Sequence, residues 1–385
     1  MRNLFFYLFL FFSSFVYSQK ERIEFSDSKN ENSINKKDTL LNKSFNSNTP
    51  INKAPINLYK IYTLQKDTTF VDTSLTIKSE YKYNFLRKDF FGLMSFSNEG
   101  QTYNTLDFGL KNKSVIPAIG FSGKHFNYLE AKDINYYSVP TPLTDLYFKT
   151  VMEQGQSLDA FLTINTKPNL NFSIAYKGLR SLGKYVNFLS SSGNFRFTSS
   201  YFTKDKRYIL NAHFTGQDIS NQENGGIINT NDFESGDDNF KERDRLDVYF
   251  EDATSLLKGN RFFVDHSFKL SKSNPNSLVF THQFSQEYKF FEFTQDNANT
   301  RFGASFSNRI SNKTRYNNLY NKLGVAYKTK SYGDLEFFIE DNNYNYYYNS
   351  VVYDSFGNIS VPNSISERVN MIGGNYTYFA NKLIA

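Results

Sequence analysis

The sequence predicts an all-β fold, in the form of a transmembrane antiparallel up-and-down β-barrel with about 12–16 strands. Three observations lead to this expectation. The 385 residues include 41 Phe and 28 Tyr but no Trp, and only 21% of them are charged. After Tyr81, apolar and polar residues alternate in short segments. The connections between these segments are short and long in turn. Aromatic enrichment and a period of two both favour β-strands.

The alternation of apolar and polar residues locates the expected strands. In residues 170–177, Leu, Phe, Ile and Tyr alternate with Asn, Ser, Ala and Lys. Residues 194–201, 262–270, 301–310 and 334–340 repeat this pattern. A soluble β-sandwich also has strands with one apolar face, but its core usually consists of Val, Ile and Leu. Phe and Tyr near strand ends are typical of the aromatic girdles of a membrane barrel, whose lumen accepts the polar face.

The connections alternate in length, which is typical of bacterial outer-membrane barrels. We expect tight turns at Lys167–Asn169 and Lys204–Lys206. Long connections are expected at Gly178–Gly193 and again after Thr215. We also expect one helical turn at Asp252–Gly259, where Asp is an acceptable N-cap and Gly a helix stop.

The first part of the chain has the features of an export signal. Arg2 is followed by the unbroken apolar run Leu4–Phe12 and by small residues before Gln19. A single membrane anchor is the alternative, but the run is shorter than the roughly 20 residues of a spanning helix. The expected organisation is a signal peptide (1–18), a polar and partly disordered periplasmic segment (19–80), and an outer-membrane β-barrel (81–385).

No enzymatic site is expected from the residue pattern. The absence of cysteine excludes disulfides, thiolate metal sites and cysteine nucleophiles. The four histidines accompany no nucleophile motif, and we therefore expect neither a cofactor nor a metal site. These histidines are His125, His213, His266 and His282. Gly178–Lys184 matches the first seven positions of a phosphate-binding loop, but Tyr185 stands where the motif has Ser or Thr. An ordinary strand connection is therefore expected.

Three basic residues form the candidate site. Lys177, Arg180 and Lys184 are close in sequence and could set a positive field at the mouth of a pore, contact its solute, or bind lipopolysaccharide phosphates. The alternative is a basic connection with no specific role. No residue is expected to act as a catalyst or as a metal ligand.

Several sequence blocks carry a family resemblance, namely Asp72–Thr76, Tyr81–Asp89, Asn98–Asn104, Val139–Leu146, Glu153–Gln156, Tyr176–Tyr185 and Leu257–Gly259. These blocks are similar to those of the putative porin family of Bacteroidota outer membranes. The resemblance implies an outer-membrane β-barrel with a porin role. The ending Asn381–Ala385 departs from the family's aromatic closing strand, which leaves open whether the chain is a fragment of a longer protein. If it is a fragment, the barrel cannot close within this chain.

The expected function is passive diffusion of small solutes through a hydrated lumen in the outer membrane of a Gram-negative bacterium. The alternatives are a non-conducting structural or secretion-associated barrel plugged by loops such as 219–245, an outer-membrane lipid hydrolase, and a secreted soluble adhesin. The expected partners are outer-membrane lipid and lipopolysaccharide, the barrel-assembly machinery and small solutes, and no nucleic acid. The sequence leaves open whether the protein is a homo-oligomer.

Overall fold

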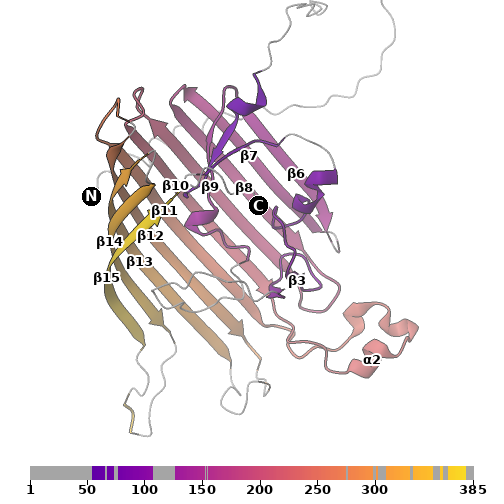
Figure 1. The fold of residues 1–385 in the computed structure, drawn as a ribbon. Coiled ribbons are helices and arrows are strands. Elements are labelled where there is room, and N and C mark those ends of the chain that lie inside the picture. Colours follow the sequence, from indigo (N-terminus) through magenta and orange to yellow (C-terminus); the bar gives the residue numbers. More distant parts are fainter. Residues whose placement is uncertain are drawn as a thin grey trace, which may run out of the picture. The chain divides into compact units, whose positions relative to one another are not determined.

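The computed structural model is built around one large antiparallel sheet (Figure 1). It describes residues 54–65, 67–72, 77–106, 126–151, 153, 155–274, 276–297, 301, 309–329, 333–349, 356–358 and 363–378. The sheet has ten strands, each hydrogen-bonded to its neighbours in sequence. These are β6 (Leu143–Val151), β7 (Gly155–Lys167), β8 (Leu170–Ser181), β9 (Ser190–Phe202), β10 (Tyr208–Gln222), β11 (Thr254–Lys269), β12 (Ser277–Gln295), β13 (Ile310–Lys328), β14 (Asp334–Tyr348) and β15 (Ser364–Thr377). The expected all-β, up-and-down antiparallel fold is confirmed.

Within the part of the chain that the structure describes, the sheet has ten strands instead of the expected 12–16 and does not close into a barrel. In the described residues β6 and β15 pair only with β7 and β14, respectively. Two causes lower the count. The strands are long, with 19 residues each in β12 and β13. In addition, the sheet begins at Leu143 rather than soon after Tyr81.

The residues before the sheet form short elements instead of barrel strands. Strands β1 (Lys60–Tyr62), β2 (Thr68–Phe70) and β5 (Tyr136–Ser138) make a three-stranded sheet, and β3 (Leu93–Ser95) pairs with β4 (Tyr103–Thr105). Short 3-10 helices lie at Ile56–Leu58, Ile77–Lys82 and Ala131–Asp133. Residues 77–106 and 126–139, which we call the docked segment, supply the side chains that contact the large sheet.

Connection length differs between the two ends of the strands. At one end, the connections are 168–169, 203–207, 270–276 and 329–333. At the opposite end, they are 152–154, 182–189, 223–253, 296–309 and 349–363, of which only the first is very short. The two expected tight turns are confirmed at the end with short connections. The longest connection carries helix α2 (Thr230–Glu234), which projects away from the sheet (Figure 1).

The two faces of the sheet differ in both polarity and exposure. On β8, Leu170, Ile174 and Tyr176 point to one face, which we call the outer face, where Ile174 is 46% exposed. Asn171 and Lys177 point to the opposite, inner face and are buried. The expected period of two is therefore confirmed on β8, with burial reversed relative to a soluble protein, because polar side chains are covered and apolar ones are exposed. The expected strand at 301–310 lies mostly outside the described residues.

The outer face changes character along the strands. On β14, Leu335, Phe337 and Ile339 follow the short connection and are exposed to the surroundings. Asp341 and Asn343 come next on the same face, toward the long connections. The apolar part of the outer face thus lies near the short connections, and a polar extension lies near the long ones.

The expected helical turn at Asp252–Gly259 is wrong, because Thr254 onward belongs to β11. Ser255, Leu257 and Gly259 face inward while Leu256 and Lys258 face outward, which is a strand period. Pairing of this segment with β10 and β12 satisfies its backbone groups, and this tertiary pairing outweighs the local helix signals. The phosphate-loop match at Gly178–Lys184 likewise begins inside β8.

Candidate functional site

The docked segment packs its apolar side chains against the inner face. Phe85 and Leu86 contact Leu179 of β8 in one buried cluster. Tyr128 contacts Ile219 of β10 and Leu257 of β11 in a second cluster, and Leu257 is fully buried. Burial of a large apolar side chain stabilises by about 1.5–3 kcal/mol. The inner face, which is mostly polar, therefore also carries apolar side chains against which this segment packs.

Side chains of the sheet also bind the backbone of the docked segment. Gln217 of β10 accepts a hydrogen bond from the N–H of Leu129 at 2.8 Å and donates one to its carbonyl oxygen at 3.0 Å. Asn221 of the same strand donates to the carbonyl oxygen of Gly100 at 3.2 Å. These contacts satisfy backbone groups that are removed from water.

Asn98 fixes the other end of the segment. Its Nδ2 donates to the carbonyl oxygens of Ser181, at 3.1 Å, and Phe188, at 2.7 Å. The hydroxyl of Ser181 donates back to Oδ1 of Asn98 at 2.6 Å. Asn98 is 2% exposed, so these bonds form in a site with little access to water.

A buried charge network joins the segment to β11 and β12. Nη1 of Arg261 lies 3.3 Å from Oε2 of Glu130 and 3.5 Å from Oε1 of Glu287, and Nη2 donates to the carbonyl oxygen of Leu129. Tyr128 donates its hydroxyl to Glu287 at 2.8 Å. Arg261 is only 2% exposed. Removing one member of such a network leaves a buried charge without its partner, which is costly.

The surroundings of Tyr128 make its phenol a weaker acid. Burial, followed by the nearby carboxylate of Glu287, raises the pKa of the Tyr128 phenol far above its usual range, and Arg261 only partly offsets this. The phenol therefore stays protonated in the docked segment and keeps donating its hydrogen bond.

His213 completes the network on the inner face. Nε of Arg261 donates to Nε2 of His213 at 3.4 Å, and Nδ1 of His213 is 2.8 Å from the hydroxyl of Tyr136. An imidazole whose Nε2 accepts from arginine carries its proton on Nδ1 and can donate it to the Tyr136 oxygen. Both ring nitrogens of His213 are thus engaged on the inner face. His125 lies outside the described residues.

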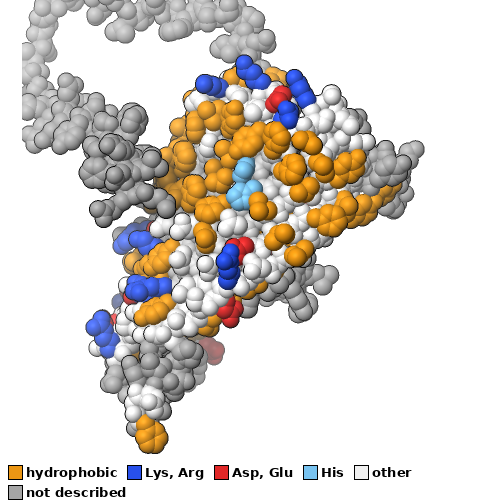
Figure 2. Space-filling model, turned by 90° about the vertical axis from the view of Figure 1, so that its left-hand side faces the viewer, with side chains coloured by type: hydrophobic (Ala, Val, Ile, Leu, Met, Phe, Trp, Pro, Cys, Tyr) orange, Lys and Arg blue, Asp and Glu red, His pale blue; other side chains and the backbone are white. Residues whose placement is uncertain are grey.

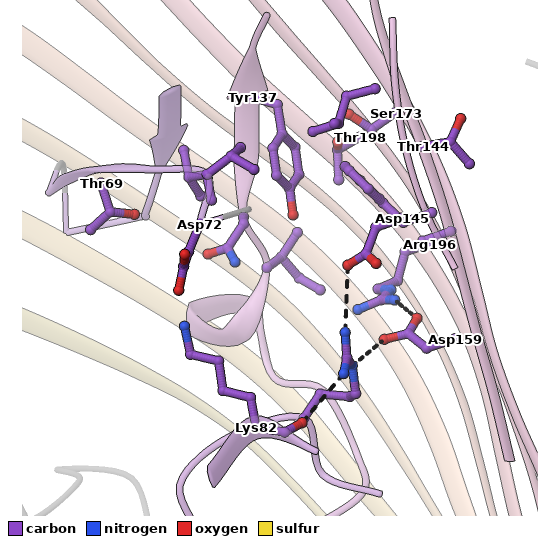
Figure 3. Close-up of a pocket in the computed structure, with 18 of the residues that line it drawn as sticks. Thr69, Asp72, Lys82, Tyr137, Thr144, Asp145, Asp159, Ser173, Arg196 and Thr198 are labelled. Carbon is purple, nitrogen blue, oxygen red and sulfur yellow. Dashed lines mark hydrogen bonds and ion pairs between the residues drawn. The ribbon is translucent and has the colours of Figure 1, made fainter. Parts of the chain in front are cut away.

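A cavity of about 750 Å³ lies between the N-terminal elements and the inner face of β6 to β9 (Figure 3). Arg87 lies 3.5 Å from Asp145 and 3.7 Å from Asp159, and Arg196 lies 2.9 Å from Asp159. Tyr137 borders the same space. The two arginines thus face two aspartates, and the charges of these four side chains balance one another.

The structure separates the three basic residues singled out in the sequence. Lys177 faces inward and is 5% exposed, with Nζ 3.4 Å from Oδ1 of Asn127 and 4.2 Å from the centre of the Phe85 ring. Arg180 is exposed on the outer face, in the part of β8 that approaches the long connections. Lys184 is exposed in the connection 182–189. Lys177 and Arg180 thus cannot contact the same bound molecule.

Sequence reasoning missed the residues that hold the docked segment, chiefly Glu130, Gln217, Arg261 and Glu287. Gln217, Arg261 and Glu287 occupy inward positions of strands with the expected period, so alternation could have placed them on the polar face. Nothing in the sequence paired them with Glu130. Within the described ranges there is no group of three or more histidine or acidic side chains placed to hold a metal ion. No helix among those residues combines the length and hydrophobicity needed to cross a membrane.

Comparisons with known proteins place this arrangement in a family. A search of curated proteins finds no match. A siderophore receptor, PiuA from Acinetobacter baumannii, is similar in structure, with a TM-score of 0.37 and 9% identity over 60% of this chain and 37% of the receptor chain. A family model described as "Putative porin" matches residues 55–385, which include the docked segment and all ten strands. The chain therefore belongs to this porin family.

Proposed function

We propose that the protein is an outer-membrane β-barrel of a Gram-negative bacterium through which small hydrophilic solutes diffuse passively. The observation that carries this proposal is the reversed burial of the sheet. Leu323, Phe337 and Ile339 are each more than half exposed on the outer face, whereas Asn194 and Thr215 on the inner face are fully buried. An exposed apolar face is unfavourable in water but not in lipid, and in a membrane barrel the opposite, polar face lines the lumen.

The apolar part of the outer face gives the orientation in this proposal. In bacterial outer-membrane barrels the short turns face the periplasm and the long loops face outside. The apolar rows near the short connections would then lie in the membrane, and the polar extension with α2 would lie outside the cell. Arg180 would lie where lipopolysaccharide phosphates are expected, whereas Lys177 and the cavity charges would face the lumen.

Unsatisfied polar atoms on the inner face support a hydrated interior. Oγ of Ser192, Oδ1 of Asn194 and Oγ1 of Thr215 are buried without a hydrogen-bond partner among the described residues. Buried polar groups of this kind are generally satisfied by water. Water at these groups would form part of a hydrated interior, and solute selectivity would be set by the lumen charges with no chemical step.

The docked segment favours a second candidate, a barrel whose lumen is closed. The expected plug, residues 219–245, does not have this role in the structure, because Ile219–Gln222 belong to β10 and α2 projects outward. The docked segment instead occupies the inner face through Gln217 and Arg261. In this candidate the protein inserts but conducts only when the segment leaves.

Single-channel recording distinguishes the two candidates. Full-length protein purified from outer membranes would be added to planar bilayers in salts whose cation and anion differ in mobility. Discrete current steps from the unmodified protein support solute diffusion. Protein that inserts but remains silent contradicts open diffusion. Steps that appear only after Arg261→Met, which removes the cation that holds Glu130 and Leu129, support the closed barrel.

A further inference from the structure

An apolar cavity lies on the outer face of β11 to β15, away from the docked segment. Its volume is about 520 Å³, within the range of about 300–1,000 Å³ found for ligand pockets. Its apolar lining includes Phe268, Phe280, Leu323, Val325, Phe337 and Ile339. Each of these side chains is more than one-third exposed, so the cavity opens to the surroundings. We call it the outer groove.

Two histidines interrupt this apolar surface. His266 of β11 and His282 of β12 face each other across the strands, with Nε2 of His266 2.8 Å from Nδ1 of His282. Figure 2 shows histidine side chains surrounded by hydrophobic ones on this face. A polar pair on a lipid-facing surface is energetically unfavourable unless its hydrogen bonds are satisfied, so we expect a hydrogen-bonding partner for it.

The hydrogen bonds of the two histidines leave one N–H donor without an acceptor when Tyr208 donates to His266. The hydroxyl of Tyr208 lies 3.4 Å from Nδ1 of His266. When Tyr208 donates to this nitrogen, neutral His266 carries its proton on Nε2 and donates to His282. His282 then carries its own proton on Nε2, for which the described residues supply no acceptor. In this tautomer the outer groove contains an N–H group available to an oxygen of a ligand.

A cation lies at the end of the groove nearest the short connections. The guanidinium carbon of Arg207 is 4.8 Å from the centre of the Phe268 ring. Its Nε and Nη2 donate to the carbonyl oxygens of Lys269 and Leu270 at 3.1 and 2.9 Å, which fixes the group and leaves Nη1 for another acceptor. Lys206 is exposed in the same turn. The only acid in this turn is already engaged, because Asp205 accepts hydrogen bonds from Thr203 Oγ1 and the Arg207 N–H.

The spacing of these groups matches one class of ligand. Phe268, beneath Arg207, and His266 are two positions apart on β11, which corresponds to about 6.8 Å along a strand. A glycerophospholipid places its phosphate and its ester carbonyl groups at a comparable separation, with acyl chains beyond. His282, Leu323 and Ile339 are paired positions on β12, β13 and β14, so their row crosses the strands from His266. The groove therefore offers a cation, then a hydrogen-bond donor along β11, and an apolar row that runs from that donor across the sheet.

We propose that the outer groove binds one glycerophospholipid. Arg207 binds the phosphate, Nε2 of His282 donates to an ester carbonyl oxygen, and one acyl chain lies over Leu323 and Ile339. This inference rests on the proposed membrane location. The short connections face the periplasm in that orientation, so the lipid comes from the periplasmic leaflet rather than from lipopolysaccharide.

Photocrosslinking in lipid nanodiscs tests the site. Full-length protein would be reconstituted in phosphatidylcholine with a trace of phosphatidylethanolamine that carries a photoreactive group in one acyl chain. We expect labelled peptides to cluster at 278–284, 319–327 and 335–341. Arg207→Gln should lower this labelling about tenfold, the loss expected for one charge-assisted hydrogen bond. Leu323→Trp, which fills the groove, should also abolish it.

Matched controls separate the site from general lipid contact. Lys272→Gln removes a cation from an exposed position in the connection 270–276 and should leave labelling unchanged. An excess of inorganic phosphate should not compete, and photoreactive lipopolysaccharide should label the groove weakly. A gel-mobility difference between heated and unheated samples checks that each variant is folded.

Several outcomes would overturn the proposal. These are labelling spread evenly over the outer face, equal losses in the Arg207 and Lys272 variants, strong labelling by lipopolysaccharide, and crosslinks that join two copies of the chain through the groove. Conductance of the same preparation separates the two proposals. Groove labelling in a protein that carries no current removes only solute diffusion, whereas current with even labelling removes only the lipid site.

Discussion

Arg261 and Glu130 are separated by 131 positions in the sequence, yet their side chains meet at 3.3 Å on the inner face of the sheet. Arg261 belongs to β11 and Glu130 to the docked segment. The same guanidinium also binds the carbonyl oxygen of Leu129. One buried side chain thus connects the segment that precedes the sheet to a strand in its middle, and most of the predictions below follow from this connection.

Replacing Arg261 by Met should release the docked segment. The change removes the nearer of the two cations that Glu130 and Glu287 share and leaves only Lys289, at 3.8 and 4.0 Å. Breaking a buried ion pair costs up to about 3–5 kcal/mol. Limited proteolysis should cut residues 126–139 much faster than in the unmodified protein. Arg315→Met, at an exposed position of β13, is the matched control and should not change the cleavage rate. Equal protection of both variants would contradict a clamping role for Arg261.

Gly259 provides a steric test of the same contact. A Cβ atom at this position would lie 2.3 Å from the Tyr128 hydroxyl oxygen, closer than non-bonded atoms approach. Gly259→Ala should therefore displace Tyr128 and weaken docking by about 1–3 kcal/mol. Gly216→Ala makes the same change where the nearest atom is 3.3 Å away and should be tolerated. Hydrogen exchange of residues 126–139 would measure the difference, and equal exchange in both variants would argue against close packing at Tyr128.

Alkaline pH should loosen the docked segment. A released Tyr128 ionises near pH 10, whereas burial and Glu287 raise the pKa of the docked phenol. The released form therefore loses protons first, so docking is fully supported below about pH 10 and weakens as the pH rises above it. Proteolysis across this range should show increasing cleavage at 126–139. Tyr128→Phe should flatten the dependence, and an unchanged slope in that variant would assign the effect to another group.

The two faces predict different effects for Lys177 and Arg180. Lys177→Gln removes an inward amine and should shift the ion preference of an open channel toward cations. Arg180→Gln removes an outward charge and should leave ion preference unchanged while lowering retention of lipopolysaccharide. Reversal potentials in asymmetric salt and lipid analysis of the purified protein measure the two effects. A change in reversal potential with Arg180→Gln would contradict its outward placement.

The strands could be predicted because the alternation is strong and extends over many residues. The period in 170–177 and 334–340 identified both the strands and the chemistry of their faces, since alternate side chains of a strand lie on opposite faces of the sheet. The tight turn at Lys204–Lys206 was predicted from its composition. These features are local, and local sequence is sufficient to determine them.

The features that were not predicted depend on contacts distant in sequence. Residues 81–142 contain aromatic and polar residues like those of the strands, so composition did not separate the docked segment from the sheet. At Thr254–Gly259 the capping residues suggested a helix, but pairing with two neighbouring strands decided the outcome. The meeting of Glu130 and Arg261 depends on how the sheet curves and on what covers it, and a periodicity carries no such information.

The position of the docked segment also constrains the order of folding. Ribosomes make residues 77–139 before any strand of the large sheet, but their binding groups, Gln217, Arg261 and Glu287, lie on strands made much later. The segment cannot reach its final hydrogen bonds until β10 to β12 have paired. Contacts between such distant positions form slowly, because the intervening chain must first be ordered. The docked segment is therefore among the last parts to reach its final position, although it is made before the sheet. A folding intermediate in which the segment is not yet docked would expose the polar inner face of the sheet until that step.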